Sequence, residues 1–346
     1  MGSRAAVLEA PRRFALVERS TPEPEAGEVV VRMAATAVCH TDLEIYTGRH
    51  PGVRYPVVLG HEATGTVERT GVGVSGFSPG QPVIINPVIA CGSCDSCRRD
   101  AGHLCRNAGL FGREIDGSLG ELVRLPARYL HALPPTLPLD AATLIQTLST
   151  VRHAQTRAGI AAGEAVVILG QGATGLLHTR MAVLAGANPV IAISRSGWKL
   201  ALARRHGAHR TLDGAAEEVA AEVLRATAGA GADVVVDTVG GGATLTAGID
   251  MLRPGGRLCV FAVSREPVPA FTTFPLYFKE VSLIGSRALR PEDMVKAIEL
   301  VATGAVDVGG FITATYPLDR IADAFADYER NPSAILRIVI SPQEAA

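Results

Sequence analysis

A short apolar run followed by a glycine-rich turn constrains this chain more than any other feature of its sequence. Ala165–Leu169 is entirely apolar, and it leads through the turn LGQGATG into a helical pattern that continues to Ala185. A strand without polar residues is typical of a parallel sheet covered by helices on both faces. In this setting the G-x-G-x-x-G spacing predicts a turn whose backbone amides approach a pyrophosphate, formed by Gly170, Gly172, Ala173, Thr174 and Gly175.

The same alternation of apolar strand and helix continues over residues 151–288. Further strands are predicted at Val190–Ile193, Asp233–Asp237 and Gly256–Val263. Residues 1–150 differ, because they are rich in Gly, Pro and short β-branched runs, which predicts a strand-dominated domain. Residues 289–346 are expected to return to that first domain through two helices and a last strand, Pro291–Thr303, Leu318–Arg330 and Leu336–Ile340.

Composition narrows the function classes. The chain has 346 residues, with 33 Lys+Arg against 34 Asp+Glu, so its net charge of −1 disfavours binding to nucleic acid or to an anionic membrane surface. No apolar run approaches the ~20 residues that span a bilayer, and Met1–Pro11 lacks the apolar core of a signal peptide. We therefore expect a cytoplasmic protein without nucleic-acid or membrane partners.

Four of the six cysteines fall in the segment CGSCDSCRRDAGHLC. They are Cys91, Cys94, Cys97 and Cys105. Four closely spaced thiolates can form a closed tetrahedral zinc site with no position for substrate, so a structural zinc is predicted. A zinc ribbon for nucleic acid is disfavoured by the net charge, and an iron–sulfur site by the lack of a fourth close-spaced Cys followed by Pro.

Two other segments place a zinc-type ligand beside a carboxylate: Cys39-His40-Thr41-Asp42 and Gly60-His61-Glu62. A single Cys or His is most often a buried structural residue. Together with the four-cysteine segment, the glycine-rich turn, DVVVDTVGG, PGGRLCVFA and ILRIVI, however, these segments make the chain resemble the zinc-dependent medium-chain alcohol dehydrogenases over nearly its whole length.

This resemblance implies an α/β architecture with a GroES-like β-rich catalytic domain, a Rossmann domain with a doubly wound parallel sheet, and an active site in the cleft between them. It implies that Cys39 and His61 bind a catalytic zinc, that Asp42 orients His61, and that Thr41 hydrogen-bonds the substrate hydroxyl. In such enzymes zinc acts as a Lewis acid and the alcohol transfers hydride to a nicotinamide. The implied activity interconverts an alcohol and its ketone or aldehyde.

The chain departs from the family pattern at two positions. The third protein ligand of the family, a Cys, Asp or Glu, falls at Gln146, whose neutral amide is a poorer zinc ligand. We expect Glu62 to coordinate the catalytic zinc for part of the cycle, with Gln146 as a weak ligand or substrate contact; a degenerate site with low occupancy is the alternative. At the second position, Glu44 replaces the proton-relay His of many relatives, and the nearby His50 is a possible substitute.

The end of the predicted strand Val190–Ile193 indicates which cofactor is used. Ser194-Arg195 stands where NAD-specific relatives carry an acidic residue, which favours NADP(H) over NAD(H), with Lys199 as a further phosphate contact. The alternative is that Arg195 stacks on the adenine and both cofactors are used. The resemblance also implies three kinds of cofactor contact. Thr150 packs near the nicotinamide, Thr238, Val239 and Val263 line the cofactor cleft, and Arg337 reaches the pyrophosphate.

The substrate is expected to be a small-molecule secondary alcohol. The loop Tyr46–Tyr55 and the residues around Phe111–Leu119 are expected to shape the pocket. The polar residues Glu44, Arg113 and Glu114 favour a polyol, cyclitol or sugar-like compound, and a simple aliphatic alcohol stays open. The resemblance implies a homodimer or homotetramer and two zinc ions per chain. The rival functions are a zinc-free quinone or enoyl reductase of the same superfamily, which ordinarily lacks both cysteine-containing sites, and a non-catalytic NADP(H)-binding protein in which Gln146 marks a lost site.

Overall fold

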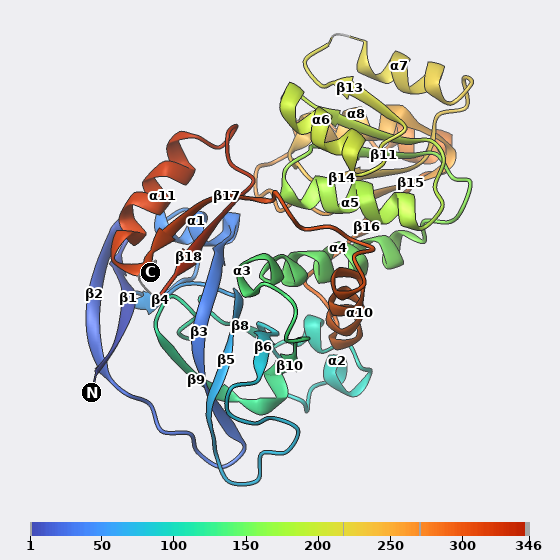
Figure 1. Ribbon diagram of the computed structural model, residues 1–346. Helices are drawn as coiled ribbons and strands as arrows, with labels where there is room; N and C mark the ends of the chain where they lie inside the picture. The colour runs from blue at the N-terminus through green and yellow to red at the C-terminus, as the bar shows by residue number, and fades with distance from the viewer. Residues whose placement is uncertain (1, 217, 270, 343–346) are drawn as a thin grey trace. The chain divides into compact units, whose positions relative to one another are not determined.

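The computed structural model describes residues 2–216, 218–269 and 271–342, which form two compact units (Figure 1). The first unit contains the described residues up to Ser149 and those from Leu289 onward, and the second is Thr150–Ala288. Each unit has its own buried apolar clusters. Among the described residues, no helix is both long enough and apolar enough to cross a membrane.

The first unit is built on antiparallel sheets. A three-stranded sheet has the order β2-β1-β4, with bounds Arg13–Ser20, Gly2–Ala10 and Val57–Val58. A larger sheet has the order β10-β6-β5-β3-β18-β17, with bounds Leu130–Ala132, Pro82–Ile85, Glu62–Thr70, Glu28–Val38, Arg337–Ser341 and Ile312–Pro317. Strand β9 (Leu122–Pro126) also pairs with β3, and the short strands β7 (Val88–Ile89) and β8 (Gly109–Leu110) pair with each other.

Strand β18 brings the end of the chain into the sheet formed by its beginning. It pairs antiparallel with β3 and parallel with β17, so the red and blue ribbons run side by side in Figure 1. Helix α11 (Ile321–Arg330) packs Phe325 against Phe14 and against Tyr46 of α1 (His40–Tyr46), with ring centroids 5.1 and 4.9 Å apart. The remaining helices of this unit are α2 (Asp95–Arg98), α3 (Leu139–Ala142), the first part of α4 (Leu144–Ala158) and α10 (Pro291–Ala302).

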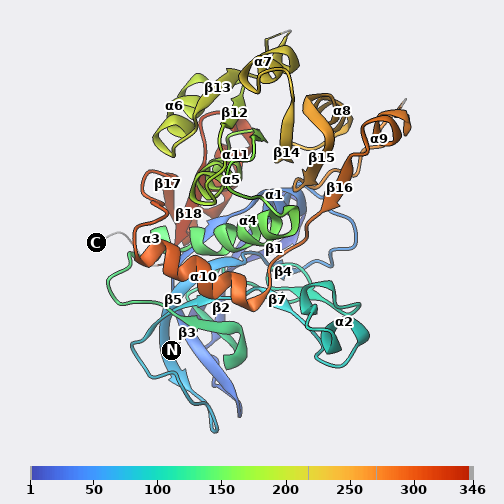
Figure 2. The same ribbon diagram turned by 90° about the vertical axis from the view of Figure 1, so that its right-hand side faces the viewer.

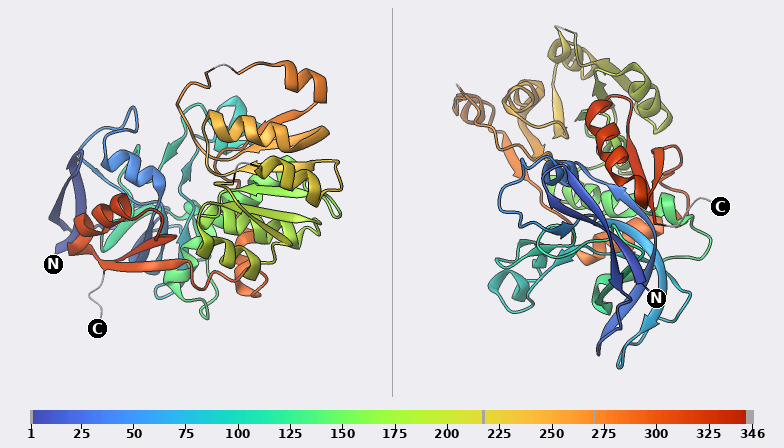
Figure 3. Two further views of the ribbon diagram at one scale, coloured as in Figure 1. Left: turned by 90° about the horizontal axis from the view of Figure 1, so that it is seen from above. Right: turned by 90° about the vertical axis from the view of Figure 1, so that its left-hand side faces the viewer.

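The second unit is a six-stranded parallel sheet of order β13-β12-β11-β14-β15-β16. The strands span Arg210–Asp213, Val190–Ser194, Val166–Leu169, Ala232–Asp237, Leu252–Val260 and Ser282–Gly285. Helices cover both faces (Figures 2 and 3), namely α5 (Ala173–Leu184), α6 (Gly197–Arg205), α7 (Val219–Ala226), α8 (Gly242–Met251) and α9 (Phe274–Lys279). This order is that of a doubly wound Rossmann sheet, which confirms the predicted fold class.

The apolar strands explain why both faces are covered. Along β11, Val167 and Leu169 pack on one face with α7 and α8, while Val166 and Ile168 pack on the other face with α4 and α5. Because neighbouring side chains of a strand point to opposite faces, an all-apolar strand needs a layer on each side. Most boundaries differ from prediction by one to three residues, and the largest difference is at β15, which spans Leu252–Val260 where Gly256–Val263 was predicted. Its register shifts where Arg253–Gly256 lie, and Val263 lies outside the sheet.

Candidate metal and cofactor sites

The two segments that carry candidate catalytic ligands meet because they flank paired strands. Strand β3 ends at Val38, directly before Cys39, and its neighbour β5 begins at Glu62, directly after His61. The strands are antiparallel and pair Ala37 with Glu62, so the end of one strand lies beside the start of the other. The register of the sheet therefore brings Cys39, His61 and Glu62 together.

The Asp42 carboxylate joins these two segments. Its Oδ2 accepts the backbone N–H of Cys39 at 2.9 Å, which caps the first turn of α1. Its Oδ1 accepts the N–H of Gly60 at 3.3 Å and lies 3.4 Å from Nδ1 of His61. This contact leaves Nε2 as the ring nitrogen that can bind a metal. Burial acts to lower the pKa of His61, but Asp42 and Cys39 outweigh it and raise that pKa well above the ordinary value.

Cys39, His61 and Glu62 form a candidate metal-binding group. One ligand atom from each residue lies within 4.8 Å of the other two, and both His61 and Glu62 are buried. The Oε2 atom of Glu62 has no hydrogen-bond partner among the described residues, although a guanidinium nitrogen lies nearby. A thiol, an imidazole and an unsatisfied buried carboxylate oxygen are donors that suit zinc.

Arg337 lies beside the candidate metal group. Its guanidinium is buried, with Nη1 3.2 Å from Oε2 of Glu62 and hydrogen-bonded to the carbonyl of Val38, while Nη2 donates to Oγ1 of Thr147 at 2.8 Å. The pKa of Arg337 is raised, because attraction to Glu62 and Cys39 exceeds the effect of burial. These contacts hold Arg337 beside Glu62 and Thr147, and its contact with the pyrophosphate stays a prediction.

The structure also describes the other residues predicted for this site. Gln146 is buried near the start of α4, directly before Thr147, which binds Arg337. Thr41 is half-buried in the first turn of α1. Glu44 lies 3.6 Å from Nε of Arg49 and 3.9 Å from Nε2 of His40, and the Nδ1 atom of His50 is 2.9 Å from the carbonyl of Pro51.

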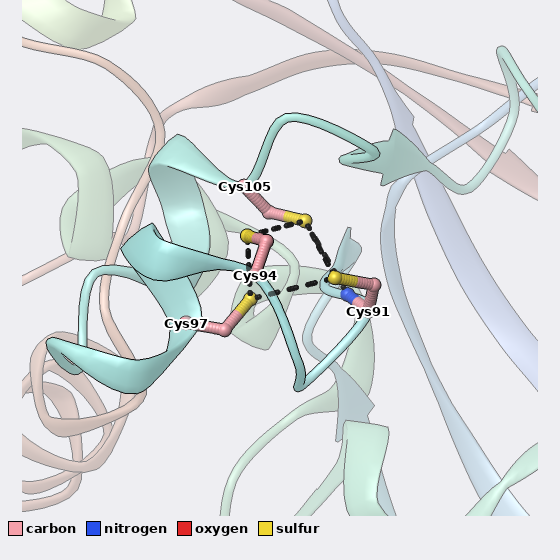
Figure 4. A group of neighbouring side chains, drawn as sticks. All are labelled: Cys91, Cys94, Cys97 and Cys105. Atoms are coloured by element: carbon pink, nitrogen blue, oxygen red, sulfur yellow. Dashed lines mark hydrogen bonds between the residues drawn. The ribbon is translucent and has the colours of Figure 1, made fainter.

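The four clustered cysteines surround one point (Figure 4). Four of their sulfur–sulfur separations are 3.9 Å for Cys91–Cys97, 3.5 Å for Cys94–Cys97, 3.7 Å for Cys94–Cys105 and 3.4 Å for Cys91–Cys105. A tetrahedral ZnS₄ group with ~2.3 Å bonds has edges of about 3.8 Å, so these separations fit one zinc ion. All four cysteines are free thiols, and hydrogen bonds from Ser93 lower the pKa of Cys91 to about 5, which favours the thiolate that a metal requires.

The glycine-rich turn contains two glycines that a larger residue could not replace without a clash. Gly170 has φ +86°, and a Cβ there would lie 2.7 Å from Oγ1 of Thr238. A Cβ on Gly175 would lie 2.0 Å from the carbonyl oxygen of Gly170, so the helix can start here only with glycine. At Gly172, the N-cap of α5, a Cβ would meet nothing within 4 Å, so this face of the turn is open to a ligand. The donors at this helix start fit a dinucleotide.

The predicted adenosine-side and cleft residues are spread over the second unit, in its strand ends, loops and helices. Ser194 ends β12, and Arg195 follows it with an exposed side chain for which no described acidic partner is found. Lys199 is half-buried, with its ammonium 5.3 Å from the ring centroid of Trp198. Val239 and Val263 are exposed, and Thr150 is the first residue of this unit. The Oγ1 atom of Thr238 donates to the carbonyl of Leu169 at 2.7 Å, so this residue also supports the turn.

Sequence reasoning missed three polar residues that shape these turns. Asp237 is buried and accepts the N–H groups of Val239 and Gly240 at 2.9 and 3.0 Å, which fixes the turn after β14. Gln171 and Thr179 are buried and hydrogen-bonded to each other next to the glycine-rich turn. A polar residue between the glycines of an otherwise apolar turn was the available sign, but its partner could not be known from spacing.

The fold and these two kinds of site define a class: a zinc-binding, nicotinamide-dependent dehydrogenase. Comparisons with known proteins agree. The family model for the alcohol dehydrogenase GroES-like domain matches residues 25–135, and the model for zinc-binding dehydrogenase matches residues 173–303. The chain belongs to the zinc-dependent medium-chain alcohol dehydrogenase family, and it is an NAD(P)-dependent oxidoreductase of alcohols.

Individual relatives cover nearly all of the chain. A 2-dehydro-3-deoxy-L-galactonate 5-dehydrogenase of Pseudoalteromonas atlantica is 32% identical over 95% of this chain and 96% of its own length. A sorbitol dehydrogenase of Halalkalibacterium halodurans is 30% identical over 90% of this chain and 91% of its own. A zinc-binding dehydrogenase from Sinorhizobium meliloti, solved with bound NADP, has a TM-score of 0.92 at 31% identity and covers 99% of this chain and 100% of that one.

Proposed function

We propose that this protein interconverts a secondary hydroxyl of a polyol or sugar-like substrate with its ketone, using a catalytic zinc and NADP(H). The observation that carries the proposal is the buried group of Cys39, His61 and Glu62, whose ligand atoms lie within 4.8 Å of one another. When bound there, zinc would polarise the substrate oxygen as a Lewis acid. The nicotinamide would accept or return a hydride.

Four residues outside the candidate metal group have further roles in this proposal. Asp42 holds His61 in the tautomer whose Nε2 faces the metal, and it holds the two ligand segments together. Thr41 would exchange a hydrogen bond with the substrate hydroxyl and pass its proton outward. Arg337 balances the negative charge of Glu62 when that carboxylate is not bound to zinc, and Gln146 serves as a weak ligand or a substrate contact.

The role of Glu62 is tested by zinc per chain, measured by elemental analysis on protein purified without chelator or added metal. We expect about two zinc ions in the wild type and about one in Glu62→Ala, in which only the four-cysteine site stays filled. Cys105→Ser should also lose about one, from the other site. Full zinc in Glu62→Ala would exclude Glu62 as a ligand, and about one zinc in the wild type would indicate a degenerate catalytic site.

NADP(H) preference is supported by Arg195, whose exposed guanidinium follows β12 where a carboxylate would repel a 2′-phosphate. The relative from Sinorhizobium meliloti was solved with NADP bound. We expect Arg195→Glu to shift the ratio of kcat/KM for NADP+ over NAD+ toward NAD+ by at least about tenfold, because a bidentate phosphate contact becomes a repulsion. Arg204→Glu, a charge reversal on exposed α6, should leave the ratio unchanged.

A polyol or sugar-like substrate is supported by the segment that lies against the ligands. The N–H groups of Gly117 and Ser118 donate to the carbonyls of Val58 and Gly60 at 2.8 and 3.1 Å, so the loop 111–119 is bound next to His61. That loop carries the ion pair Arg113–Glu114, with 2.6 Å between Nε and Oε1. Relatives named for a sugar acid, sorbitol and D-arabitol phosphate match 90–96% of this chain in sequence at 28–32% identity: 95% of the chain for the sugar-acid relative, 90% for the sorbitol relative and 96% for the D-arabitol-phosphate relative.

The substrate class is tested by comparing matched alcohols. We expect kcat/KM to be higher for a hexitol than for 2-hexanol by about a hundredfold, because several hydroxyls would be recognised by polar groups. Glu114→Ala should reduce this preference without changing zinc content. A preference for 2-hexanol would contradict the polyol proposal and leave the dehydrogenase assignment intact.

A further inference from the structure

The glycine-rich turn is braced by a buried side chain that belongs to the turn itself. Gln171 lies between Gly170 and Gly172, and its side chain is 1% exposed. A long amide in such a position must have hydrogen-bond partners, because an unpaired buried amide is costly. The neighbouring glycines serve close backbone approach, whereas Gln171 points away from the open face into the unit.

The Gln171 amide spans the turn from strand to helix. Its Nε2 donates to the carbonyl of Ile168 in β11 at 3.2 Å, and its Oε1 accepts the hydroxyl of Thr179 in α5 at 3.0 Å. Thr179 is fully buried, so water does not offer either group an alternative partner. One side chain thus ties the strand that precedes the turn to the second turn of the helix that follows it.

We propose that Gln171 and Thr179 are positioning residues for the nicotinamide cofactor, which hold the glycine-rich turn in its binding shape before the cofactor arrives. The inference rests on the proposed cofactor site at this turn. Thr238 braces the turn from another strand through its hydrogen bond to Leu169, so residues 170–175 are held from two directions. A turn that is already ordered loses less conformational entropy on binding, which increases affinity without a new contact.

The proposal predicts an effect on cofactor affinity rather than on turnover. The variants are Gln171→Leu, Thr179→Val and their combination, and NADPH fluorescence measures the Kd on the free protein. Each single variant should raise the Kd about tenfold, with kcat at saturating cofactor within about twofold of wild type. The double variant should bind no more weakly than Gln171→Leu, because that change already removes the hydrogen bond that Thr179→Val removes. Thr179→Ser should restore wild-type affinity.

Gln155→Leu is the matched control. Gln155 is also a buried amide in this unit, but its Nε2 donates to the carbonyl of His178 in α5 at 2.7 Å and not to a residue of the glycine-rich turn. We expect this variant to lower the Tm while its Kd stays within about twofold of wild type. Amide hydrogen exchange in the absence of cofactor should accelerate at residues 170–176 in Gln171→Leu and not in Gln155→Leu.

Unchanged NADPH affinity in both Gln171→Leu and Thr179→Val would overturn the proposal, as would an equal loss in Gln155→Leu, which would show a general effect of destabilisation. Additive losses in the double variant would show that the two side chains act separately, and would overturn their assignment as one brace. If the wild-type protein binds neither NADPH nor NADH, the proposed cofactor site and this inference both fail. If the wild type binds normally and the variants bind equally well, only this inference fails.

Discussion

Asp42 contacts three residues near the candidate metal group. It caps α1 through Cys39, binds the amide of Gly60 and faces the ring of His61. The carboxylate is buried, so these contacts are not exchanged for water. Loss of Asp42 should therefore affect metal binding through both ligand segments at once.

We predict that Asp42→Ala lowers zinc content by about one ion per chain, since loss of a residue that orients metal ligands typically costs 10–100-fold in affinity. Elemental analysis after dialysis against apo-buffer measures this. The control is Asp116→Ala, because Asp116 also accepts a backbone amide, that of Val58 at 2.9 Å, but does not contact His61. Equal zinc in wild type and Asp42→Ala would contradict the bridging role.

His178 makes a separate prediction about pH. It is fully buried in α5, with its ring 4.7 Å from that of Phe261, and burial lowers its pKa from 6.5 to about 3. As the pH falls below about 6.5, the unfolded chain binds a proton that the folded chain does not, so the stability of the second unit falls by up to about 1.4 kcal/mol per pH unit until the folded-state pKa is reached. Above pH 6.5 the residue adds no pH dependence.

Urea unfolding between pH 7 and pH 4 measures this, followed by fluorescence of Trp198, the single tryptophan of the chain, which lies in the second unit. His178→Gln should remove the His178 share of the slope, so the variant loses less stability than wild type on acidification. Parallel pH dependences for the two proteins would show that His178 is protonated in the folded state.

At the scale of elements, α9 and β16 leave an apolar edge uncovered within the chain. Phe274, Tyr277 and Phe278 of α9 are 64%, 82% and 71% exposed, and β16 has one described neighbour, β15. Lys279 fixes α9 to the end of α8 by donating to the carbonyls of Ile249, Asp250 and Leu252 at 3.0–3.1 Å. An apolar patch beside an unpaired strand edge is typical of an interface between copies.

We predict that the protein forms a homo-oligomer through this edge. The double variant with Tyr277→Asp in α9 and Leu283→Asp in β16 should release single chains of 36.1 kDa. Light scattering coupled to size-exclusion chromatography measures the mass. Val72→Asp is the control, because Val72 is 84% exposed in the first unit and far from β16 in sequence. A wild type that elutes as a single chain would refute the prediction.

At the same scale, local pattern accounts for most of what could be predicted. The strand–turn–helix of residues 165–184 is encoded by apolar residues and glycines that are close in sequence, and so are the four cysteines. The role of Arg337 was not predictable, because its partners Glu62, Val38 and Thr147 come from three distant segments. Partners of buried polar side chains depend on tertiary packing, which sequence periodicity does not report.

For the whole molecule, the separate cores of the two units imply that removal of zinc changes local stability in the first unit and not in the second. The four-cysteine segment belongs to the first unit, where Arg290 at the start of α10 donates to Oδ2 of Asp100 at 2.8 Å and anchors the segment. We predict that chelation of zinc accelerates amide exchange at residues 88–110 and at the start of α10, while residues 160–260 keep their protection. Hydrogen-exchange mass spectrometry measures both regions in one experiment, and uniform acceleration would show that the units unfold together.

The contacts of Asp42 hold the metal ligands independently of the loop between them. Since Asp42 ties the Cys39 and Gly60 segments directly, the intervening loop 47–54 is not needed to hold the metal ligands at their spacing. Evolution, or an engineer, can therefore exchange that loop for one of another length or chemistry and keep the reaction centre intact. A scaffold with this modularity can acquire new substrates by recombination of one short segment, without rebuilding its chemistry each time.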